Sequence, residues 1–340
     1  MIPSSQALIQ TICCILLYIF VHSDQTVALT GIQQKRSTAL DEVESTVHRV
    51  YEHHNLNIYD DCNVLDLDPK DRESMGVAIR LQKRLSALER NGDCRRCWFQ
   101  RKHCVCDEID SQPSISLESL QIRRIFLYMH HKEVGLAVDT SKYILAAYPD
   151  VCKLVVNGIS EEFQPAMKEM MEAAMTEQCL VLFPSDDAST FKKIHSENIN
   201  ALQECRNEEQ EGLNIIVIDG TWSQAQKMHG RLPNNATRVC LSEEAISTLS
   251  DSVSVCYESD SKSNVVKSTG HQLRRHPITW KQVSTLEAVG LLLRDISNVY
   301  KIDHESQESS LPWNVLRSCQ QIGDTAAKKQ LGPPRIKNKV

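Results

Sequence analysis

The sequence predicts an α/β protein built around a mainly parallel β-sheet. After residue 118, short runs of β-branched and other apolar residues alternate with longer helical segments, which is the pattern of parallel strands connected by helices. One run, residues 215–218, consists entirely of Ile and Val, as expected for a strand buried on both faces of a sheet. The chain has 340 residues, of which 41% are hydrophobic. This is sufficient for one large α/β domain with additions, or for two domains.

The segment before the sheet is expected to be polar and partly helical. Residues 24–70 are polar and acidic, with one candidate helix at residues 41–53. Residues 72–90 predict a stronger helix, because apolar residues recur at steps of three and four. Its stripe consists of Met75, Ala78, Leu81, Leu85 and Leu88. Asn91-Gly92 is typical of a helix end.

The alternating region yields five expected strands and the helices between them. The strands are expected at residues 125–129, 152–156, 179–183, 214–218 and 237–241, and the helices at residues 137–148, 165–176 and 187–206. Residues 250–270 are rich in Ser and Asp and indicate a flexible insertion. Ser284 and Glu287 fit a capping box, which predicts a further helix and gives Glu287 a structural role. The tail from residue 303 is polar, and we expect it to be disordered.

The fourth expected strand ends in a candidate site. Asp219-Gly220 follows the apolar run, Thr221 can cap a helix, and Trp222 lies in its first turn. In open α/β sheets, ligands bind at the carboxyl ends of the strands. The plain alternative is that Asp219 is only a polar turn residue and that Trp222 is only part of the core.

A cysteine cluster precedes the sheet. Cys94, Cys97, Cys104 and Cys106 form the pattern C-x2-C-x6-C-x-C, and four thiolates can complete a tetrahedral zinc site. His103 could compete as a ligand. The thirteen cysteines are odd in number and scattered in spacing, which favours a reduced protein with a metal site over a disulfide framework.

Two basic and aromatic segments suggest contact with RNA. The first, within the cysteine cluster, contains Arg95, Arg96, Arg101 and Lys102 beside Trp98 and Phe99. The second contains Arg274 and Arg275 near Trp280. Such side chains suit phosphate and base contacts, although a solvated loop over a buried aromatic pair would have the same sequence. The net charge of −6 argues against indiscriminate binding to nucleic acid.

Several common enzyme motifs are absent from the sequence. It contains no G-x-G-x-x-G, no G-x-x-x-x-G-K-[ST] and no G-x-S-x-G. Ordinary dinucleotide sites, P-loop sites and hydrolase elbows are therefore unsupported.

Four segments together resemble the DTW-domain family. Residues 219–222 match its D-x-T-W signature, and residues 130–133 resemble its H-P-x-E segment with His131 in place of proline. Residues 182–188 and 284–288 resemble its L-(Y/F)-P-S-x-D/E-A and S-T-L-E-A segments. With the preceding cysteine cluster, the resemblance covers roughly residues 90–300.

The resemblance implies a tRNA-uridine aminocarboxypropyltransferase that uses S-adenosylmethionine. It also implies a knotted, SPOUT-like fold that binds this cofactor in loops at the carboxyl end of the sheet. The cofactor residues so implied are Pro184, Ser185, Asp187, Gly220, Thr221, Trp222, Ser284 and Glu287. Asp219 would then remove the N3 proton of uridine or orient the uracil. An RNA methyltransferase of the knotted class and a non-catalytic zinc-knuckle RNA-binding protein remain alternatives.

These interpretations give the expected domain organisation. It comprises a signal-like or anchor segment (1–22), a helical and polar extension (23–92), a zinc knuckle (93–110), a DTW catalytic domain (111–300) and a polar basic tail (301–340). Residues 7–21 are apolar and have the length of a signal-peptide h-region or short anchor, but no positive charge precedes them. A secreted protein would not meet tRNA, so we expect a cytoplasmic or nuclear protein, with membrane contact only through residues 7–21. No obligate protein partner is inferred.

Overall fold

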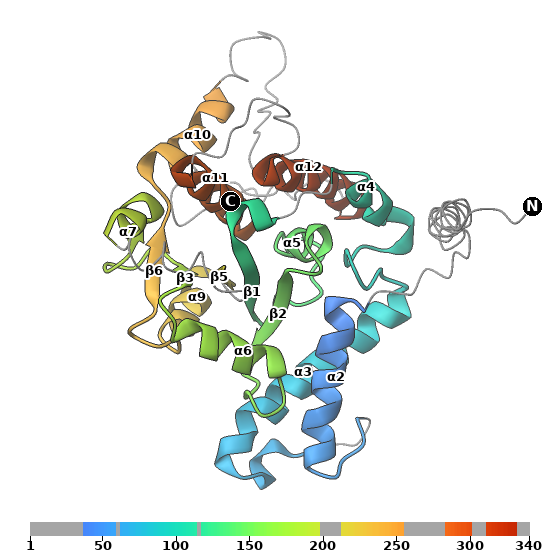
Figure 1. The fold of residues 1–340 in the computed structure, drawn as a ribbon. Helices are drawn as coiled ribbons and strands as arrows, with labels where there is room; N and C mark the ends of the chain where they lie inside the picture. The colour runs from blue at the N-terminus through green and yellow to red at the C-terminus, as the bar shows by residue number, and fades with distance from the viewer. Residues whose placement is uncertain are drawn as a thin grey trace, which may run out of the picture. The chain divides into compact units, whose positions relative to one another are not determined.

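A six-stranded, fully parallel sheet lies at the centre of the molecule (Figure 1). The computed structural model describes residues 37–58, 62–113, 117–197, 212–254, 283–300 and 311–331. The strand order is β2-β1-β5-β3-β6-β4. The strands are β1 (Ile122–His130), β2 (Cys152–Asn157), β3 (Cys179–Leu182), β4 (Ser189–Thr190), β5 (Leu213–Asp219) and β6 (Thr237–Cys240). The predicted α/β class and parallel sheet are confirmed.

Strand β5 lies between β1 and β3, and its residues Leu213 to Val217 are all buried. This agrees with the uninterrupted apolar run, because a central parallel strand is covered on both faces. The register pairs Met129 of β1 with Asp219 of β5 and His130 of β1 with Asn157 of β2. Polar residues from three strands therefore meet at one edge of the sheet.

Helices cover both faces of the sheet (Figure 1). Since successive strand residues point to opposite faces, Phe126 and Ile216 pack in one apolar cluster, and Leu127 and Val217 pack in the other. The first face is covered by α6 (Pro165–Ala174) and α9 (Trp222–His229). The second is covered by α5 (Lys142–Ala147), α7 (Phe191–Glu197), α11 (Thr285–Tyr300) and α12 (Pro312–Leu331). Helix α10 (Glu243–Ser254) follows β6.

Two longer helices, α2 (Ala39–His53) and α3 (Pro69–Asn91), lie side by side (Figure 1). Helix α2 begins at a capping box in which the Thr38 amide donates to Asp41. Helix α3 ends at Gly92, whose φ of 66° is left-handed, so the predicted helix end is confirmed. The remaining short helices are η1 (Val64–Asp66), η2 (Arg101–His103), α4 (Cys106–Asp110) and η3 (Leu117–Leu120).

Three expectations about helices were wrong in part. The helix expected at residues 137–148 covers only Lys142–Ala147, because the preceding residues form turns held by the side chain of Asp139. The helix expected at residues 187–206 is preceded by β4 and is described only over Phe191–Glu197. Residues 312–331 form helix α12, which packs against α11 and α5, so this part of the tail is not disordered.

Helix α12 forms because its apolar residues share one face. Val315, Leu316 and Cys319 are buried against the sheet side of the molecule, and their spacing of three to four residues was present in the sequence. The polar composition of the tail concealed this stripe. Within the described ranges, no helix is both long and apolar enough to span a membrane. Residues 7–21 lie outside those ranges.

Candidate functional site

Asp219 ends β5 at the centre of the carboxyl edge of the sheet. Its side chain is almost completely buried, with 5% of the residue exposed. The hydroxyl of Thr285, the first residue of α11, donates a hydrogen bond to Asp219 Oδ1. Among the described residues, none donates a hydrogen bond to the buried Asp219 Oδ2. A buried carboxylate with an unsatisfied oxygen is costly, so a functional explanation is warranted for this position.

Two more carboxyl groups surround Asp219. Asp139 lies in the turn before α5 and is also buried, and Glu133 follows β1. Burial raises the pKa of Asp219 well above its usual value, and the adjacent Asp139 carboxyl raises it further. Burial and Asp139 likewise raise the pKa of Glu133. A carboxyl group in such surroundings holds its proton nearer to neutral pH and is a stronger base when ionised.

The end of β1 places His130 beside the same turn. A Cβ atom at Gly220 would lie 3.3 Å from Cβ of His130, so Gly220 permits a close approach of the two strand ends. Burial lowers the pKa of His130, and the nearby Lys132 lowers it further. Both effects favour the neutral form of the imidazole.

A pocket of about 210 Å³ opens between the ends of β3 and β5 and the starts of α9 and α11. Asp219 itself does not line it, but Thr285, which donates to Asp219, does. Its lining includes Phe183, Pro184, Gly220, Thr221, Trp222 and Thr285. Four of the predicted cofactor residues, Pro184, Gly220, Thr221 and Trp222, therefore meet in one cavity. The structure thus brings together side chains from two predicted loops.

The other predicted cofactor residues do not line this pocket in the described part of the chain. Ser185 and Asp187 follow Pro184 in the same loop. Ser284 is fully buried, its amide donates to Glu287 Oε2 over 2.8 Å, and its hydroxyl accepts from the Glu287 amide over 3.2 Å. The predicted capping box is therefore confirmed, and it places Thr285 at the start of α11 beside Asp219.

One wall of the pocket is aromatic. Phe183 stacks on Trp222 with ring centres 5.5 Å apart and on His229 with ring centres 4.5 Å apart. Arg238 Nε donates to Nε2 of His229 over 3.2 Å, and burial, followed by the charge of Arg238, lowers the pKa of His229. Of these three rings, Phe183 and Trp222 line the pocket, and a flat aromatic surface of this kind can stack against a nucleobase.

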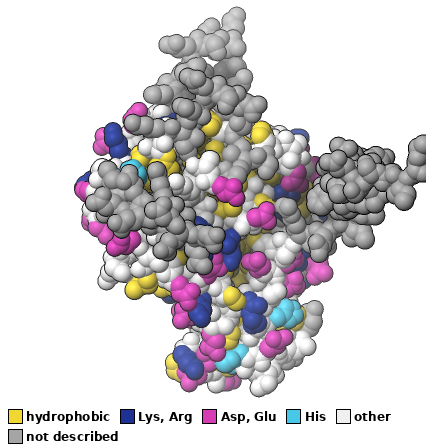
Figure 2. Space-filling model, viewed as in Figure 1, with side chains coloured by type: hydrophobic (Ala, Val, Ile, Leu, Met, Phe, Trp, Pro, Cys, Tyr) yellow, Lys and Arg dark blue, Asp and Glu magenta, His cyan; other side chains and the backbone are white. Residues whose placement is uncertain are grey.

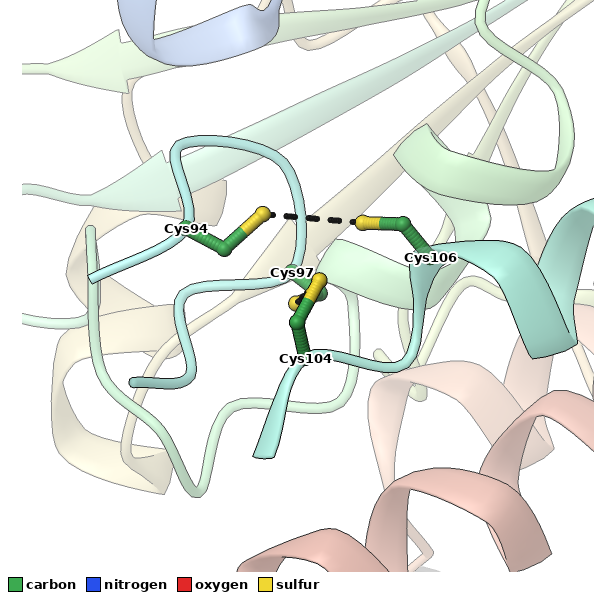
Figure 3. Close-up of side chains that lie close together, drawn as sticks. All are labelled: Cys94, Cys97, Cys104 and Cys106. Atoms are coloured by element: carbon green, nitrogen blue, oxygen red, sulfur yellow. Dashed lines mark hydrogen bonds between the residues drawn. The ribbon is translucent and has the colours of Figure 1, made fainter. Parts of the chain in front are cut away.

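The four cysteines of the cluster point toward one another (Figure 3). The sulfur atoms of Cys94 and Cys106 are 3.6 Å apart, those of Cys97 and Cys104 are 3.7 Å apart, and all four lie within 4.8 Å. A tetrahedral zinc ion with Zn–S bonds of about 2.3 Å requires sulfur separations of roughly 3.8 Å. The cluster therefore fits a zinc ion with little rearrangement. His103 is not part of this group of ligand atoms.

The chain around the cluster folds over two buried aromatic rings. Trp98 has a left-handed φ of 61°, and its amide donates to the carbonyl of Cys94 over 2.8 Å. Trp98 and Phe99 are 1% and 0% exposed. They are therefore part of the main hydrophobic core and cannot stack on bases in this conformation, which is the plain alternative stated above.

The predicted RNA-binding cations differ in their surroundings. Arg95 forms ion pairs with Asp41 and Glu44, and Arg96 pairs with both carboxylate oxygens of Asp110. Arg101 and Lys102 are exposed on η2, and in the described part of the chain neither forms an ion pair. On the face shown in Figure 2, basic and acidic side chains are interspersed. Arg274 and Arg275 lie outside the described residues.

Sequence reasoning did not identify Asp139, Glu133, His130 and Thr285 as neighbours of Asp219. A signal for them existed, because the carboxyl ends of adjacent parallel strands meet at one edge. Polar residues that follow β1 should therefore lie near those that follow β5. This inference requires that β1 and β5 are adjacent in the sheet. Sequence periodicity predicts strands but does not give their order.

The chain is similar in sequence to known proteins. A family model described as the DTW domain matches residues 91–313, more than half of the chain. One similar protein is tRNA-uridine aminocarboxypropyltransferase 2 from Macaca fascicularis, which is 26% identical over 141 residues. The match covers 41% of this chain and 41% of that relative, so the chain spans about two-fifths of the length of the curated relative. No solved structure matches.

Proposed function

Because the chain belongs to the DTW-domain family, we propose that it transfers the 3-amino-3-carboxypropyl group of S-adenosylmethionine to N3 of a uridine in tRNA. Methylthioadenosine is the second product. The observation that carries this proposal is the buried Asp219 carboxyl beside the aromatic pocket. The named activity of the similar Macaca fascicularis protein supports the same reaction class.

Asp219 is proposed to handle the N3 proton. A uridine N3 that attacks a carbon atom must lose its proton, and a carboxylate in hydrogen-bond reach can accept it. A carboxyl group at its ordinary pKa of about 3.9 is a weak base at neutral pH. Burial and Asp139 raise the pKa of Asp219, which makes its ionised form better suited to this task. Thr285 fixes the carboxyl group through its hydrogen bond to Oδ1.

The pocket is proposed to hold the cofactor. S-adenosylmethionine would supply a sulfonium, which activates its attached aminocarboxypropyl carbon toward attack by uridine N3. The Trp222 and Phe183 rings offer a stacking surface for adenine, and Gly220 leaves the turn open to close approach of a ligand. Ser185, Asp187, Ser284 and Glu287 are proposed to support the loops around the pocket. The finer fold assignment, a knotted SPOUT-like topology, is part of this proposal and is supported by the family and the parallel sheet.

A zinc ion bound by Cys94, Cys97, Cys104 and Cys106 is proposed as a structural centre of the knuckle at residues 93–110. The sulfur spacing supports a four-coordinate site with no open position, which is typical of structural rather than catalytic zinc. Its contribution would be to fix the loop that places Trp98 and Phe99 in the main hydrophobic core.

The proposed substrate is a tRNA, which implies a cytoplasmic or nuclear protein. Phosphate contacts are proposed for Arg101 and Lys102, and further contacts for Arg95, Arg96, Arg274 and Arg275. Arg95 and Arg96 would have to exchange their present carboxylate partners for phosphates, so a smaller net gain is expected from them.

The identity of the small-molecule product tests this proposal. Purified protein is incubated with unmodified tRNA and S-adenosylmethionine, and the small molecules are separated by chromatography with mass detection. The proposal predicts methylthioadenosine in amounts that require tRNA. S-adenosylhomocysteine instead would identify a methyltransferase, which could use the same pocket. Retained tRNA binding without either product would favour the non-catalytic RNA-binding alternative.

A further inference from the structure

Two histidines and one aspartate come together at the junction of α2 and α3. His53 is the last residue of α2, His54 caps its C-terminus, and Asp71 lies in the first turn of α3. Each offers one ligand atom, and the three atoms lie within 4.8 Å of one another. All three residues precede the part of the chain that matches the DTW model, so the family does not account for their arrangement.

The two inner members of this group have polar atoms without partners. Asp71 is only 9% exposed, and among the described residues no hydrogen bond or ion pair reaches its carboxylate. His54 Nε2 is also buried and has no hydrogen-bond partner there. Burial of a charged or polar group without a partner is costly. A cation bound between the two side chains would remove this cost.

The histidine rings are held in place by packing. The ring of His53 meets that of His54 edge-on, with ring centres 4.9 Å apart and an interplanar angle of 85°. It meets the ring of Phe163 in the same way, over 5.1 Å and at 68°. Arg49 Nε of α2 donates to the Phe163 carbonyl over 2.6 Å. Helix α2 is therefore already fastened to the chain around Phe163, and little further ordering is required when a ligand binds.

The loop between β2 and α6 offers a fourth ligand. Glu162 Oε1 lies 3.7 Å from His53 Nδ1, and its side chain is 61% exposed. The Ser160 amide in the same loop donates to Ser74 Oγ of α3 over 3.1 Å, so this loop is docked on the second helix as well. The Glu162 carboxylate thus stands beside the ligand group and has room to turn toward it.

The donor set indicates the class of ion. Imidazole nitrogens combined with carboxylate oxygens suit zinc and neighbouring divalent transition ions, whereas magnesium and calcium prefer oxygen ligands alone. The carbonyl groups at the end of α2 carry partial negative charge, which also favours a cation. Zinc bonds of about 2.0–2.2 Å can join ligand atoms that are up to roughly 4.4 Å apart. The group must therefore contract slightly, which predicts weaker binding than at the cysteine cluster.

We propose that His53, His54 and Asp71 bind one exchangeable divalent transition-metal ion, with Glu162 as a fourth ligand. The ion fastens the end of α2 to the start of α3 and to the loop after β2. It is separate from the zinc of the cysteine cluster and is lost more readily during purification. This proposal does not rest on the proposed transfer reaction.

Metal titration of the full chain tests the proposal. Gel filtration removes loosely bound metal, and the protein is then titrated with Zn²⁺ in a calorimeter. Wild-type protein should bind about one further ion per chain. Asp71→Asn keeps the size of the side chain but removes its charge, and His54→Ala removes a ligand nitrogen. Each change should weaken binding by more than about tenfold, since even the loss of a group that only supports a metal ligand typically costs this much.

Two controls identify the site. His48→Ala changes a histidine of α2 outside the ligand group, so this variant should bind zinc as the wild type does. Titration with Co²⁺ identifies the ligand atoms, because sulfur ligands give strong charge-transfer absorption in the near ultraviolet and nitrogen and oxygen ligands do not. The further Co²⁺ ion should lack this absorption. That result distinguishes the site from Cys62, which lies between α2 and α3 in the sequence.

The outcomes decide the assignment. Binding of a further ion by the wild type and His48→Ala, with the expected loss in Asp71→Asn and His54→Ala, supports it. Circular dichroism checks the folding of each variant, and His53→Ala replaces His54→Ala if the latter does not fold. Equal binding by all variants, the absence of a further ion in the wild type, or sulfur absorption from the further Co²⁺ ion would overturn the proposal.

Discussion

The ammonium of Lys142 lies 3.7 Å from the centre of the Phe99 ring, and this contact joins the cysteine cluster to the turn that carries Asp139. Phe99 belongs to the chain between Cys97 and Cys104. Lys142 also donates to the Ala137 carbonyl and, through its amide, to Asp139. The cysteine cluster and the turn at Asp139 are thus connected by one side chain with no exposed surface.

Replacement of Lys142 by Met should therefore reduce the transfer rate more than it reduces stability. Met fills the apolar space of the lysine stem, but loss of the ammonium leaves the Ala137 carbonyl without this donor, which should lower the free energy of unfolding by about 1–3 kcal/mol. The turn would lose its bond to Ala137, and a misplaced catalytic group can cost about a hundredfold in rate. Thermal denaturation and single-turnover kinetics measure both quantities. Lys168→Met, at an exposed position of α6, is the control and should leave both unchanged.

The stability of the protein should depend on Asp219 in a pH-dependent way. Because the pKa of Asp219 is raised in the folded protein, the folded state binds this proton more tightly than the unfolded state does. The free energy of unfolding therefore falls as pH rises from the unfolded pKa of about 3.9 through the folded pKa. Asp219→Asn removes this pH-dependent decrease in the free energy of unfolding. The variant should therefore be more stable than the wild type, and the difference between them should grow with pH. Denaturant titrations between acidic and mildly alkaline pH measure it, and a gain independent of pH would contradict the raised pKa.

Much of the framework was predictable from the sequence because its signals are local. The apolar run before Asp219, the Ser284–Glu287 capping box and the glycine after α3 each depend on a few adjacent residues, and each is confirmed. A site at the carboxyl ends of the strands was predicted because ligands bind there in open α/β sheets, and the family resemblance named the loops that form it. In contrast, the close approach of Gly220 to His130 depends on strand order, which places β1 beside β5 although the two strands are far apart in the sequence.

Polar composition also misled two expectations. Helix α12 is polar on average, but the residues that it buries recur at helical spacing. Trp98 and Phe99 stand among arginines in the sequence and yet both rings are buried. In both cases the apolar residues of a largely polar segment are buried by tertiary packing. The average composition of a segment does not show which of its residues will be buried.

The cysteine cluster should bind one zinc ion per chain and lose it when a ligand is replaced. Cys97→Ser removes a buried sulfur from the tetrahedral set, and an incomplete site leaves the knuckle without its main source of stability. Elemental analysis of protein purified without chelator should find about one zinc in the wild type and almost none in the variant. Cys152→Ser changes a buried cysteine outside the cluster and should retain the metal. A wild-type protein free of zinc would refute the assignment.

Binding to tRNA should depend more on Arg101 and Lys102 than on Arg95 and Arg96. The first two cations are exposed, whereas the second two already pair with carboxylates. Charge reversal at Arg101 or Lys102 should lower tRNA affinity and reduce the slope of log affinity against log salt by roughly 0.7–0.9 per lost phosphate contact. Affinity for S-adenosylmethionine should stay nearly constant. If the slope of log affinity against log salt is the same in the wild type and the variants, Arg101 and Lys102 are not part of the tRNA interface.

The measurement that tests the account most directly is nucleoside analysis of tRNA after reaction with S-adenosylmethionine labelled in its aminocarboxypropyl chain. Wild-type protein should place the label on uridine N3. If Asp219 removes the proton, Asp219→Asn and Asp219→Ala should both lose about a hundredfold to ten-thousandfold in rate; if it only orients the uracil, Asn should retain much more activity than Ala. Because Asp219 is 5% exposed, folding of each variant is checked by circular dichroism. Unlabelled uridine from the wild-type reaction, or wild-type turnover by Asp219→Ala with subsaturating tRNA, would contradict the account.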